Sequence, residues 1–186
     1  MRPPKRLILA FAFTLAAPSA FAADKLTLIL DWFVNPDHAP IIVAAQKGYF
    51  TEAGLDVEIV PPADPSDPPK LVAAGRVDLG VSYQPTHQIQ VGQGLPLVRI
   101  ATLIATPLNS IVVLKDGPIK SIKDLKGKKV AATKGTDPFL FLLRSLHAEG
   151  LKKSDIEHVA LQHADGRAAL EQGKVDAWAG LDPLMA

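Results

Sequence analysis

The residues best suited to chemistry in this chain form one run, Asp31-Trp32-Phe33-Val34-Asn35-Pro36-Asp37-His38-Ala39-Pro40. It places two carboxylates, an amide, an imidazole and a tryptophan directly after a strand-like segment. A simple connection would use Gly, Ser or Asn and would leave large aromatics to the core. Two prolines stiffen the run, so its polar groups are held in place. The run predicts one wall of a small-molecule pocket; the alternative is that Trp32 and Phe33 only pack at the edge of a core.

A second run, Thr133-Lys134-Gly135-Thr136-Asp137, precedes a predicted helix that starts at Pro138. Backbone N–H groups and the positive end of the helix dipole favour an anionic group at such a turn. The hydroxyls of Thr133 and Thr136 would add hydrogen-bond donors. The alternative is an ordinary helix N-cap, which needs only Thr136 or Asp137. The residues leave both interpretations open.

The elements that must position these runs alternate between short β-branched strands and helices. This alternation predicts an α/β fold with a largely parallel sheet and helices on both faces. Ligands of such folds sit beyond the carboxyl ends of strands, which is where the Asp31 run lies. Caps and glycines mark the helix ends. The predicted strands are Leu26–Leu30, Leu55–Val60, Val77–Val81, Leu97–Leu103, Asn109–Leu114, Lys129–Ala132, Glu157–Leu161 and Val175–Ala179, and the predicted helical segments include Pro40–Lys47, Pro68–Ala74, a capped turn at Ser121–Asp124, Pro138–Glu149 and Ala168–Gln172.

An internal echo divides the chain into two parts. Gly75-Arg76-Val77-Asp78 leads to Gln84-Pro85, and Gly173-Lys174-Val175-Asp176 leads to Asp182-Pro183 with the same spacing. Two βαβ lobes built on one plan explain this echo. We expect lobe 1 over 23–116 and lobe 2 over 117–186, with a cleft between them. Because a helix and a return crossing to the first lobe are expected after the last residue, we interpret the sequence as a fragment with its C-terminal part missing; the alternative is a small two-lobed protein.

Composition and the N-terminal residues limit the function classes. Residues 1–22 show a basic start, an apolar stretch and the small-residue site Ala20-Phe21-Ala22, which predicts a signal peptide and export to a bacterial periplasm. The chain contains no cysteine, so neither a disulfide nor a lipidated cysteine is expected. Without its first 22 residues the chain has 17 Lys and Arg against 19 Asp and Glu. No basic stripe is present, which argues against nucleic acid as a partner.

Metal chemistry is weakly supported by the residue pattern. Asp37, His38 and His87 are candidates to converge, and His158 and His163 lie close together in the sequence. No cysteine is available, and no histidine pair has the helical spacing of a zinc motif. We therefore expect no metal and no cofactor.

The chain resembles one superfamily of periplasmic binding proteins in two ways. Lys25–Lys129 resembles the binding proteins for thiamine's pyrimidine precursors, most specifically through the run Leu30–Ala39. From Val130 onward the chain looks like binding proteins for aliphatic sulfonates and taurine, through Thr133–Asp137, Gln162–Arg167 and Val175–Pro183. Supporting matches in the first half are Lys47-Gly48-Tyr49-Phe50, Gly54-Leu55-Asp56-Val57, Leu71-Val72-Ala73-Ala74-Gly75, Ser82-Tyr83-Gln84-Pro85 and Thr106-Pro107-Leu108-Asn109-Ser110.

The resemblance implies an α/β, two-lobed periplasmic-binding-protein (type II) fold and a role in import. The chain would be the monomeric substrate-binding component of an ABC importer, handing its ligand to a permease in the inner membrane. The expected ligand is a thiamine pyrimidine precursor of the hydroxymethylpyrimidine or formylaminopyrimidine type; the alternative is an aliphatic sulfonate or taurine. The residues expected to bind the ligand are Asp31, Trp32, Asn35, Asp37, His38, Tyr83, Gln84, Asn109, Thr136 and Asp182.

The same superfamily includes a eukaryotic enzyme that makes the thiamine pyrimidine with pyridoxal phosphate. The resemblance would place that enzyme's cofactor lysine near Ser82, yet this chain has no lysine between Lys70 and Lys115. The enzyme's cysteine-rich motif is also absent. Covalent pyridoxal phosphate chemistry requires a Schiff-base amine. We therefore expect a binding protein and not an enzyme.

Overall fold

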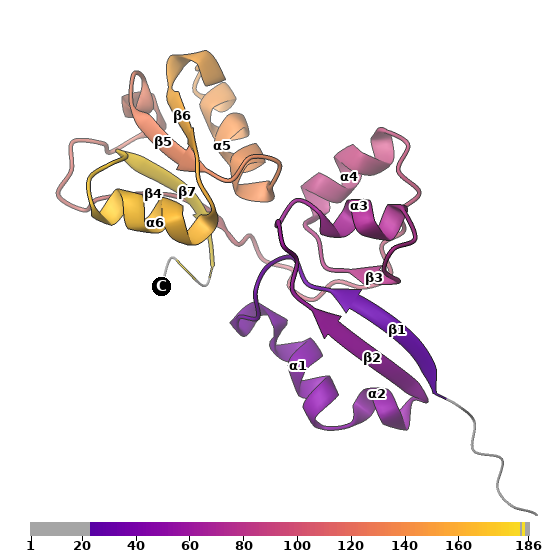
Figure 1. Cartoon of the computed structure of the whole chain (residues 1–186). Coiled ribbons are helices and arrows are strands. Elements are labelled where there is room, and N and C mark those ends of the chain that lie inside the picture. Colours follow the sequence, from indigo (N-terminus) through magenta and orange to yellow (C-terminus); the bar gives the residue numbers. More distant parts are fainter. Residues whose placement is uncertain (1–22, 183, 185–186) are drawn as a thin grey trace, which may run out of the picture.

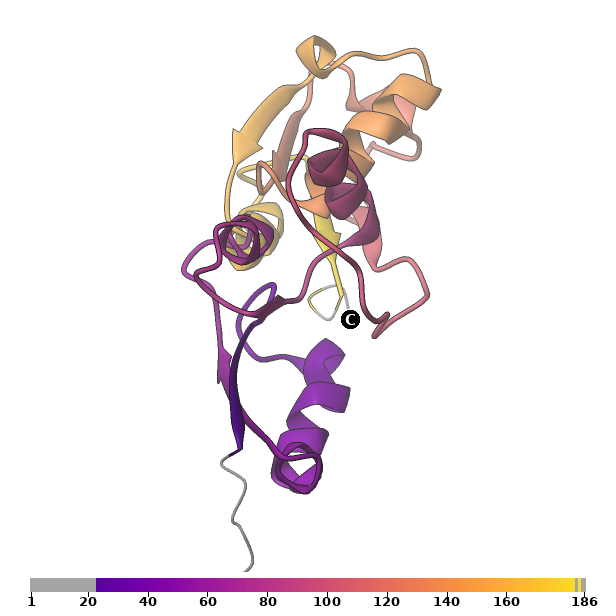
Figure 2. The ribbon, with the colours of Figure 1, turned by 90° about the vertical axis from the view of Figure 1, so that its right-hand side faces the viewer.

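The computed structural model of the chain describes residues 23–182 and 184. Two α/β lobes follow one another along the chain, each built around its own sheet (Figure 1). Turned by 90°, helix α4 of the first lobe lies in front of the second lobe, where it packs against α5 (Figure 2). The predicted signal peptide and Pro183 of the internal echo lie outside the described residues.

The first lobe holds a three-stranded sheet of parallel strands in the order β2-β1-β3. Helices α1 and α2 lie on one side of this sheet and α3 lies on the other (Figures 1 and 2). The elements are β1 (Asp24–Ile29), the 3-10 turn η1 (Pro36–His38), α1 (Ala39–Gln46), α2 (Tyr49–Glu52), β2 (Leu55–Val60), α3 (Pro68–Ala73), β3 (Leu79–Gly80) and α4 (Gln84–Gly92).

The second lobe holds a four-stranded sheet in the order β4-β7-β5-β6. Strands β5, β6 and β7 run parallel, whereas β4 pairs antiparallel with β7, so the sheet is mixed. The elements are β4 (Asn109–Val113), the 3-10 turn η2 (Ile122–Leu125), β5 (Lys129–Ala132), α5 (Asp137–Ala148), the 3-10 turn η3 (Lys153–Asp155), β6 (Glu157–Ala160), α6 (His163–Glu171) and β7 (Ala177–Leu181).

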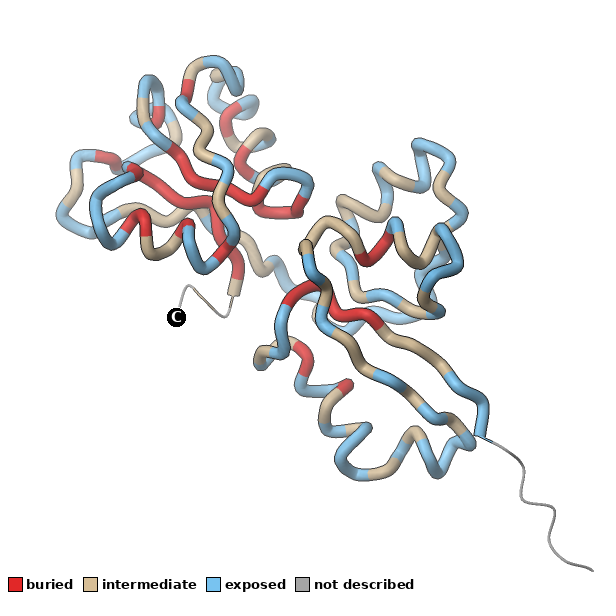
Figure 3. Tube along the Cα trace, in the orientation of Figure 1, coloured by how far each residue is buried: buried red, intermediate tan, exposed pale blue. Residues whose placement is uncertain are grey.

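Burial is concentrated in the central strands of the second sheet (Figure 3). Successive residues of a strand point to opposite faces, and β5 follows this rule. Val130 and Ala132 pack with Leu142 and Leu146 of α5, whereas Ala131 packs with Trp178 and α6 on the other face. Trp178 is 2% exposed and is the largest fully buried side chain of the described residues. The second lobe is therefore a three-layer α/β unit.

Most predicted elements overlap the observed ones, but the predicted strand Leu97–Leu103 does not form and the short helix α2 and helix α4 were not predicted. Leu97–Leu103 forms no strand, and Val98 and Ile100 are 84% and 76% exposed. An alternating apolar sequence gains strand structure only when a neighbouring strand supplies hydrogen bonds. Helix α4 was not predicted, because no cap side chain marks its start at Tyr83. The predicted largely parallel arrangement is confirmed, with one antiparallel strand, β4, at the edge of the second sheet.

The lobe boundary at 116/117 remains a prediction. Strand β4 precedes that position and pairs with β7 of the second sheet through Asn109 and Leu181. We therefore propose that the chain passes from lobe 1 to lobe 2 before Asn109.

Candidate functional site

A pocket lies where the two lobes meet. Lobe 1 contributes Asp31, Trp32 and Tyr83, and lobe 2 contributes Thr136 and His163. Asp31 follows the end of β1 by two residues, so the pocket lies beyond the carboxyl end of the central strand of the first sheet. This is the location at which open α/β sheets bind ligands. The remaining cavity measures about 10 Å³, room for roughly one water molecule.

Asp31 is the centre of the polar network in the pocket. Its carboxylate is 8% exposed and accepts two short hydrogen bonds, from Tyr83 Oη at 2.5 Å and from His38 Nε2 at 2.6 Å. Burial by itself raises the pKa of the Asp31 carboxyl, but the two hydrogen bonds outweigh burial and hold that pKa below its usual value. Burial and the Asp31 charge together raise the pKa of the Tyr83 hydroxyl. Asp31 therefore carries its negative charge, and Tyr83 stays a neutral donor.

The loop after Asp31 is locked by a capping box. The Asn35 side chain accepts the Asp37 N–H at 2.9 Å, and His38 Nδ1 accepts the Asn35 N–H at 3.3 Å. Because Nδ1 accepts, a neutral His38 carries its proton on Nε2 and donates it to Asp31. His38 is 1% exposed. Asn35 and His38 thus position Asp31 rather than opening onto the pocket.

Trp32 spans the boundary between the lobes. It is 8% exposed, lies 4.0 Å from the Phe33 ring centroid, and meets the His163 ring of lobe 2 edge-on at 4.8 Å and 72°. Its neighbour Phe33 is 46% exposed. The indole therefore both lines the pocket and packs against the opposite lobe.

The lobe 2 wall offers fewer donors than the sequence predicted. Thr136 Oγ1 donates to the Thr133 carbonyl at 2.6 Å, and Thr133 Oγ1 donates to the Leu161 carbonyl at 2.8 Å. Neither hydroxyl hydrogen is left for a ligand, and Thr136 makes no side-chain cap to α5. Asp137 at the start of α5 is 5% exposed and accepts a short hydrogen bond from Asn109 Nδ2. Burial raises the pKa of the Asp137 carboxyl, and the Asn109 bond opposes that rise.

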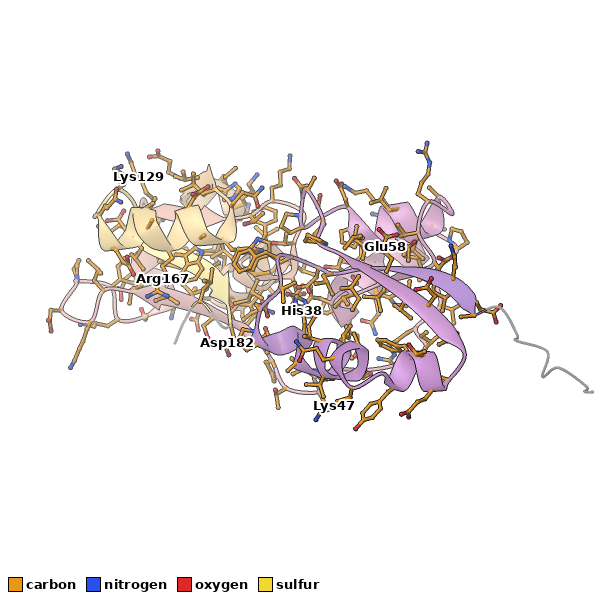
Figure 4. The ribbon with its side chains drawn as sticks, turned by 60° about the horizontal axis from the view of Figure 1, so that its bottom comes forward. His38, Lys47, Glu58, Lys129, Arg167 and Asp182 are labelled. Carbon is orange, nitrogen blue, oxygen red and sulfur yellow. The ribbon has the colours of Figure 1, made fainter. Side chains whose placement is uncertain are left out.

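The remaining predicted site residues lie around the pocket rather than in it. Asn109 pairs with Asp137, and its Oδ1 is buried with no partner among the described residues. Gln84 is exposed and accepts a hydrogen bond from Arg99 at 3.0 Å, so the structure does not bring it to the pocket. Asp37 of lobe 1 and Asp182 of lobe 2 are near enough for their charges to interact: burial and the charges of Asp31 and Asp182 raise the pKa of Asp37. Figure 4 shows the labelled His38 and Asp182 where the lobes meet.

The pocket carries an acidic character. Asp31 lines it and Asp37 is held nearby, whereas its lining includes no lysine or arginine among the residues that the structure describes. Within the same described range, no helix is long and apolar enough to cross a membrane, and no three His, Cys, Asp or Glu side chains gather as metal ligands would.

His163 is a pocket residue that sequence reasoning did not assign. It opens α6, is 2% exposed, and contacts Thr133 Oγ1 through Nδ1 at 3.3 Å. The signal in the sequence that could have indicated this role is the position of His163, directly after a predicted strand and at the first position of a helix. Its role became visible only once β5 and β6 paired and placed Thr133 beside it.

The burial of His163 predicts a pH-dependent stability. Burial lowers the pKa of its imidazole to about 4, whereas an unfolded histidine titrates near 6.5. Between these values the unfolded chain binds more protons, so stability falls as the pH is lowered, by about 2 kcal/mol between pH 7 and pH 5. Urea unfolding at both pH values measures this loss. His163→Gln should remove it, whereas replacement of the exposed His147 by Gln should not; equal pH dependence in both variants would contradict the assignment.

The fold and its interlobe pocket define a periplasmic-binding-protein type of architecture. The aliphatic-sulfonate-binding protein SsuA of Escherichia coli matches the chain with a TM-score of 0.62 and 28% identity, over 86% of this chain and 55% of SsuA. This match confirms the predicted α/β fold class. The model of the NMT1/THI5 like family matches residues 35–183, and the chain belongs to this family.

The chain is similar to three curated proteins with names related to the thiamine pyrimidine. A "putative thiamine biosynthesis protein" of Haemophilus influenzae is 50% identical over 180 residues, which is 95% of this chain and 57% of the relative. The formylaminopyrimidine-binding protein of Halalkalibacterium halodurans is 39% identical over 67% of this chain and 38% of its own length. The Saccharomyces cerevisiae 4-amino-5-hydroxymethyl-2-methylpyrimidine phosphate synthase THI13 is 32% identical over 87% of this chain and 47% of its own length. The chain spans about half the length of the curated relatives it matches.

Proposed function

We propose that the chain is the substrate-binding component of a periplasmic ABC importer and that it binds a thiamine pyrimidine precursor in the interlobe pocket. The ligand would stabilise closure of the lobes and then pass to a membrane permease, with no bond made or broken. The observation that carries the proposal is the ionised Asp31 beside Trp32 and Tyr83. A formylaminopyrimidine-binding relative supports the same ligand class.

The polar groups of the pocket favour a ligand that donates hydrogen bonds. Asp31 is a buried carboxylate acceptor in the lining, and the hydroxyl hydrogens of Tyr83 and Thr136 are already donated to protein oxygens. The hydroxyls of Ser66, Ser82 and Thr86 complete the polar lining, and a hydroxyl can accept as well as donate. An aminopyrimidine supplies N–H donors to such acceptors and a flat ring to the indole of Trp32. The exocyclic amine therefore complements the pocket.

The same groups disfavour a sulfonate. A sulfonate is favoured by cations around its oxygens, and the described lining of the pocket holds the hydroxyls of Ser66, Ser82 and Thr86 but neither lysine nor arginine. Asp137 already places a carboxylate at the N-terminus of α5, where the helix dipole would otherwise attract an anion. The solved sulfonate-binding neighbours therefore support the fold more than the ligand.

A synthase activity is the second candidate, because the chain is 32% identical to a pyrimidine phosphate synthase. Pyridoxal phosphate would need a lysine in the pocket to form a Schiff base. No lysine is among its described lining residues, and Ser82 stands where the resemblance would place the cofactor lysine. The residues present do not fit a Schiff-base cofactor. We therefore favour binding without catalysis.

Thermal denaturation with a ligand panel tests the proposed function. A ligand at 100 times its Kd adds about 2.7 kcal/mol of stability, which corresponds to a Tm increase of about 5–10 °C for a chain of this size. We expect this increase with 4-amino-5-hydroxymethyl-2-methylpyrimidine or formylaminopyrimidine, and none with taurine or ethanesulfonate. An increase with the sulfonates alone would overturn the pyrimidine proposal. Absorbance of protein-bound pyridoxal phosphate would instead favour the synthase.

Trp32 should report ligand binding directly. The chain has two tryptophans, and Trp178 is buried in the core of lobe 2, away from the pocket lining. We expect the pyrimidine to change the emission of the wild-type chain and Trp32→Phe to abolish that change while raising the Kd a few-fold, since phenylalanine keeps a smaller ring and aromatic stacking contributes about 0.5–1.5 kcal/mol beyond area burial. A ligand-induced emission change that survives Trp32→Phe would show that Trp32 is only a packing residue.

A further inference from the structure

His163 is held in one orientation by contacts on two sides. On one side, its ring meets the indole of Trp32 edge-on, with 4.8 Å between the ring centroids. On the other, Nδ1 lies 3.3 Å from Thr133 Oγ1. The residue is 2% exposed yet lines the interlobe pocket. The ring is therefore fixed in the lining of the pocket.

The hydrogen-bond partners of Thr133 decide which nitrogen of His163 carries the proton. A hydroxyl has one hydrogen, and that of Thr133 is donated to the Leu161 carbonyl at 2.8 Å. Thr133 Oγ1 can then only accept from His163, so Nδ1 must be the N–H donor. Burial lowers the pKa of the imidazole to about 4, so the ring is neutral near pH 7. In a neutral ring with a protonated Nδ1, Nε2 holds a lone pair.

The Nε2 lone pair has no hydrogen-bond partner within residues 23–182 and 184. Buried polar atoms are nearly always paired, and leaving one unpaired costs stability. Among the described residues, the side-chain polar atoms that are both fully enclosed and unpaired are His87 Nε2, Gln90 Oε1 and Asn109 Oδ1. His163 Nε2 is not one of them, so this unpaired atom is not fully enclosed. Because Nε2 is not fully enclosed and His163 lines the pocket, we infer that this atom is an acceptor available to a ligand.

We propose that His163 is a specificity-determining residue whose Nε2 accepts a hydrogen bond from an N–H or O–H group of the ligand. Asp31 of lobe 1 and His163 of lobe 2 would then accept hydrogen bonds from opposite sides of the pocket. Only a ligand with donors on both sides would form hydrogen bonds to both lobes. The identity of the ligand rests on the proposed function; the protonation pattern of His163 does not. On a hydroxymethyl aminopyrimidine the donor is either the exocyclic amine or the hydroxyl.

A long-range ¹H–¹⁵N correlation spectrum of the free chain at pH 7 tests the acceptor assignment without any ligand. We expect the His163 ring to show one protonated and one unprotonated nitrogen, with the proton on Nδ1. A proton on Nε2, or on both nitrogens, would overturn the proposal. If the pattern is as expected and no pyrimidine binds, the acceptor assignment stands and the proposed function fails, so the two failures are distinguishable.

Calorimetric titration of two variants with 4-amino-5-hydroxymethyl-2-methylpyrimidine tests the contact itself. Glutamine places an amide oxygen near the position of Nε2, whereas leucine offers no acceptor. We expect His163→Leu to raise the Kd about 10- to 100-fold, the cost of an unpaired buried donor, and His163→Gln to raise it only a few-fold. His147→Gln on the exposed face of α5 is the matched control and should bind as the wild type does. Equal losses in the leucine and glutamine variants would reduce His163 to a packing role.

Ligand analogues identify the donor that His163 reads. One analogue lacks the exocyclic amine and the other carries a methyl group in place of the hydroxymethyl. The wild type and His163→Leu should bind one of these analogues with nearly equal affinity, because the group that Nε2 accepts from is already gone. If His163→Leu weakens both analogues as much as the parent pyrimidine, the proposed hydrogen bond is contradicted.

Discussion

Asp31→Asn is expected to weaken pyrimidine binding about 100-fold or more and to lower the free energy of unfolding by about 3 kcal/mol. The carboxylate accepts from both Tyr83 and His38 within a buried site. An asparagine has one oxygen, so its amide N–H group faces one of these two donors and leaves that donor unpaired. Removing one partner of a buried charged network typically costs 3–5 kcal/mol, and loss of the negative charge removes the acceptor for the ligand amine. Urea unfolding and calorimetric titration measure the two losses.

Two comparisons separate the role of Asp31 from a general loss of charge. Asp116→Asn, at an exposed turn, removes the same charge and should change neither stability nor binding by a measurable amount. Tyr83→Phe removes one of the two donors to Asp31 and should cost less stability than Asp31→Asn does. If Asp31→Asn binds the pyrimidine as tightly as the wild type, the carboxylate does not contact the ligand.

Trp178→Ala is expected to lower the free energy of unfolding by about 3–5 kcal/mol, the usual cost of removing a buried tryptophan. Trp178 lies in β7 between Ala131 of β5 and Ala169 and Leu170 of α6, and it is 2% exposed. Its indole is so closely surrounded that a Cβ added at Gly166 would lie 2.6 Å from Trp178 Cδ1. The surrounding backbone cannot fill the space that alanine would leave. Chemical denaturation measures the loss.

An exposed aromatic residue provides the control for this core prediction. Phe141 of α5 is 38% exposed, and Phe141→Ala should cost far less than Trp178→Ala. Gly166→Ala adds a methyl group against the indole and should destabilise the chain although alanine favours helices. A Trp178→Ala variant no less stable than Phe141→Ala would show that the packing between the second sheet and α6 does not depend on the indole.

The positions of the main elements could be predicted because the local signals are strong. Apolar runs such as Lys129–Ala132 are bounded by glycines, and Ser121 with Asp124 forms the expected capping box. The Asp31 run follows the first strand as predicted, since prolines and polar residues cannot continue a buried strand. The sequence also suggested a pocket at this run, because a large aromatic such as Trp32 is unusual in a simple turn.

The parts that could not be predicted depend on contacts between distant residues. Leu97–Leu103 has the alternation of a strand, but strand structure requires a neighbour that local sequence does not reveal. Gln84 lies away from the pocket, where its Oε1 accepts a hydrogen bond from the guanidinium of Arg99, fifteen residues later. His163 entered the site because Thr133 and Trp32, from different elements and different lobes, meet its ring. Each case is decided by tertiary packing.

The central claim, that Asp31 makes this pocket select a flat ligand bearing an amine, is tested most directly by a paired calorimetric titration. The wild-type chain is titrated with 4-amino-5-hydroxymethyl-2-methylpyrimidine and with the analogue in which an oxo group replaces the amine. We predict tight binding of the amine and at least 100-fold weaker binding of the oxo analogue, since its oxygen would face the Asp31 carboxylate. Equal binding of the two pyrimidines, or binding of taurine in place of both, would contradict the account.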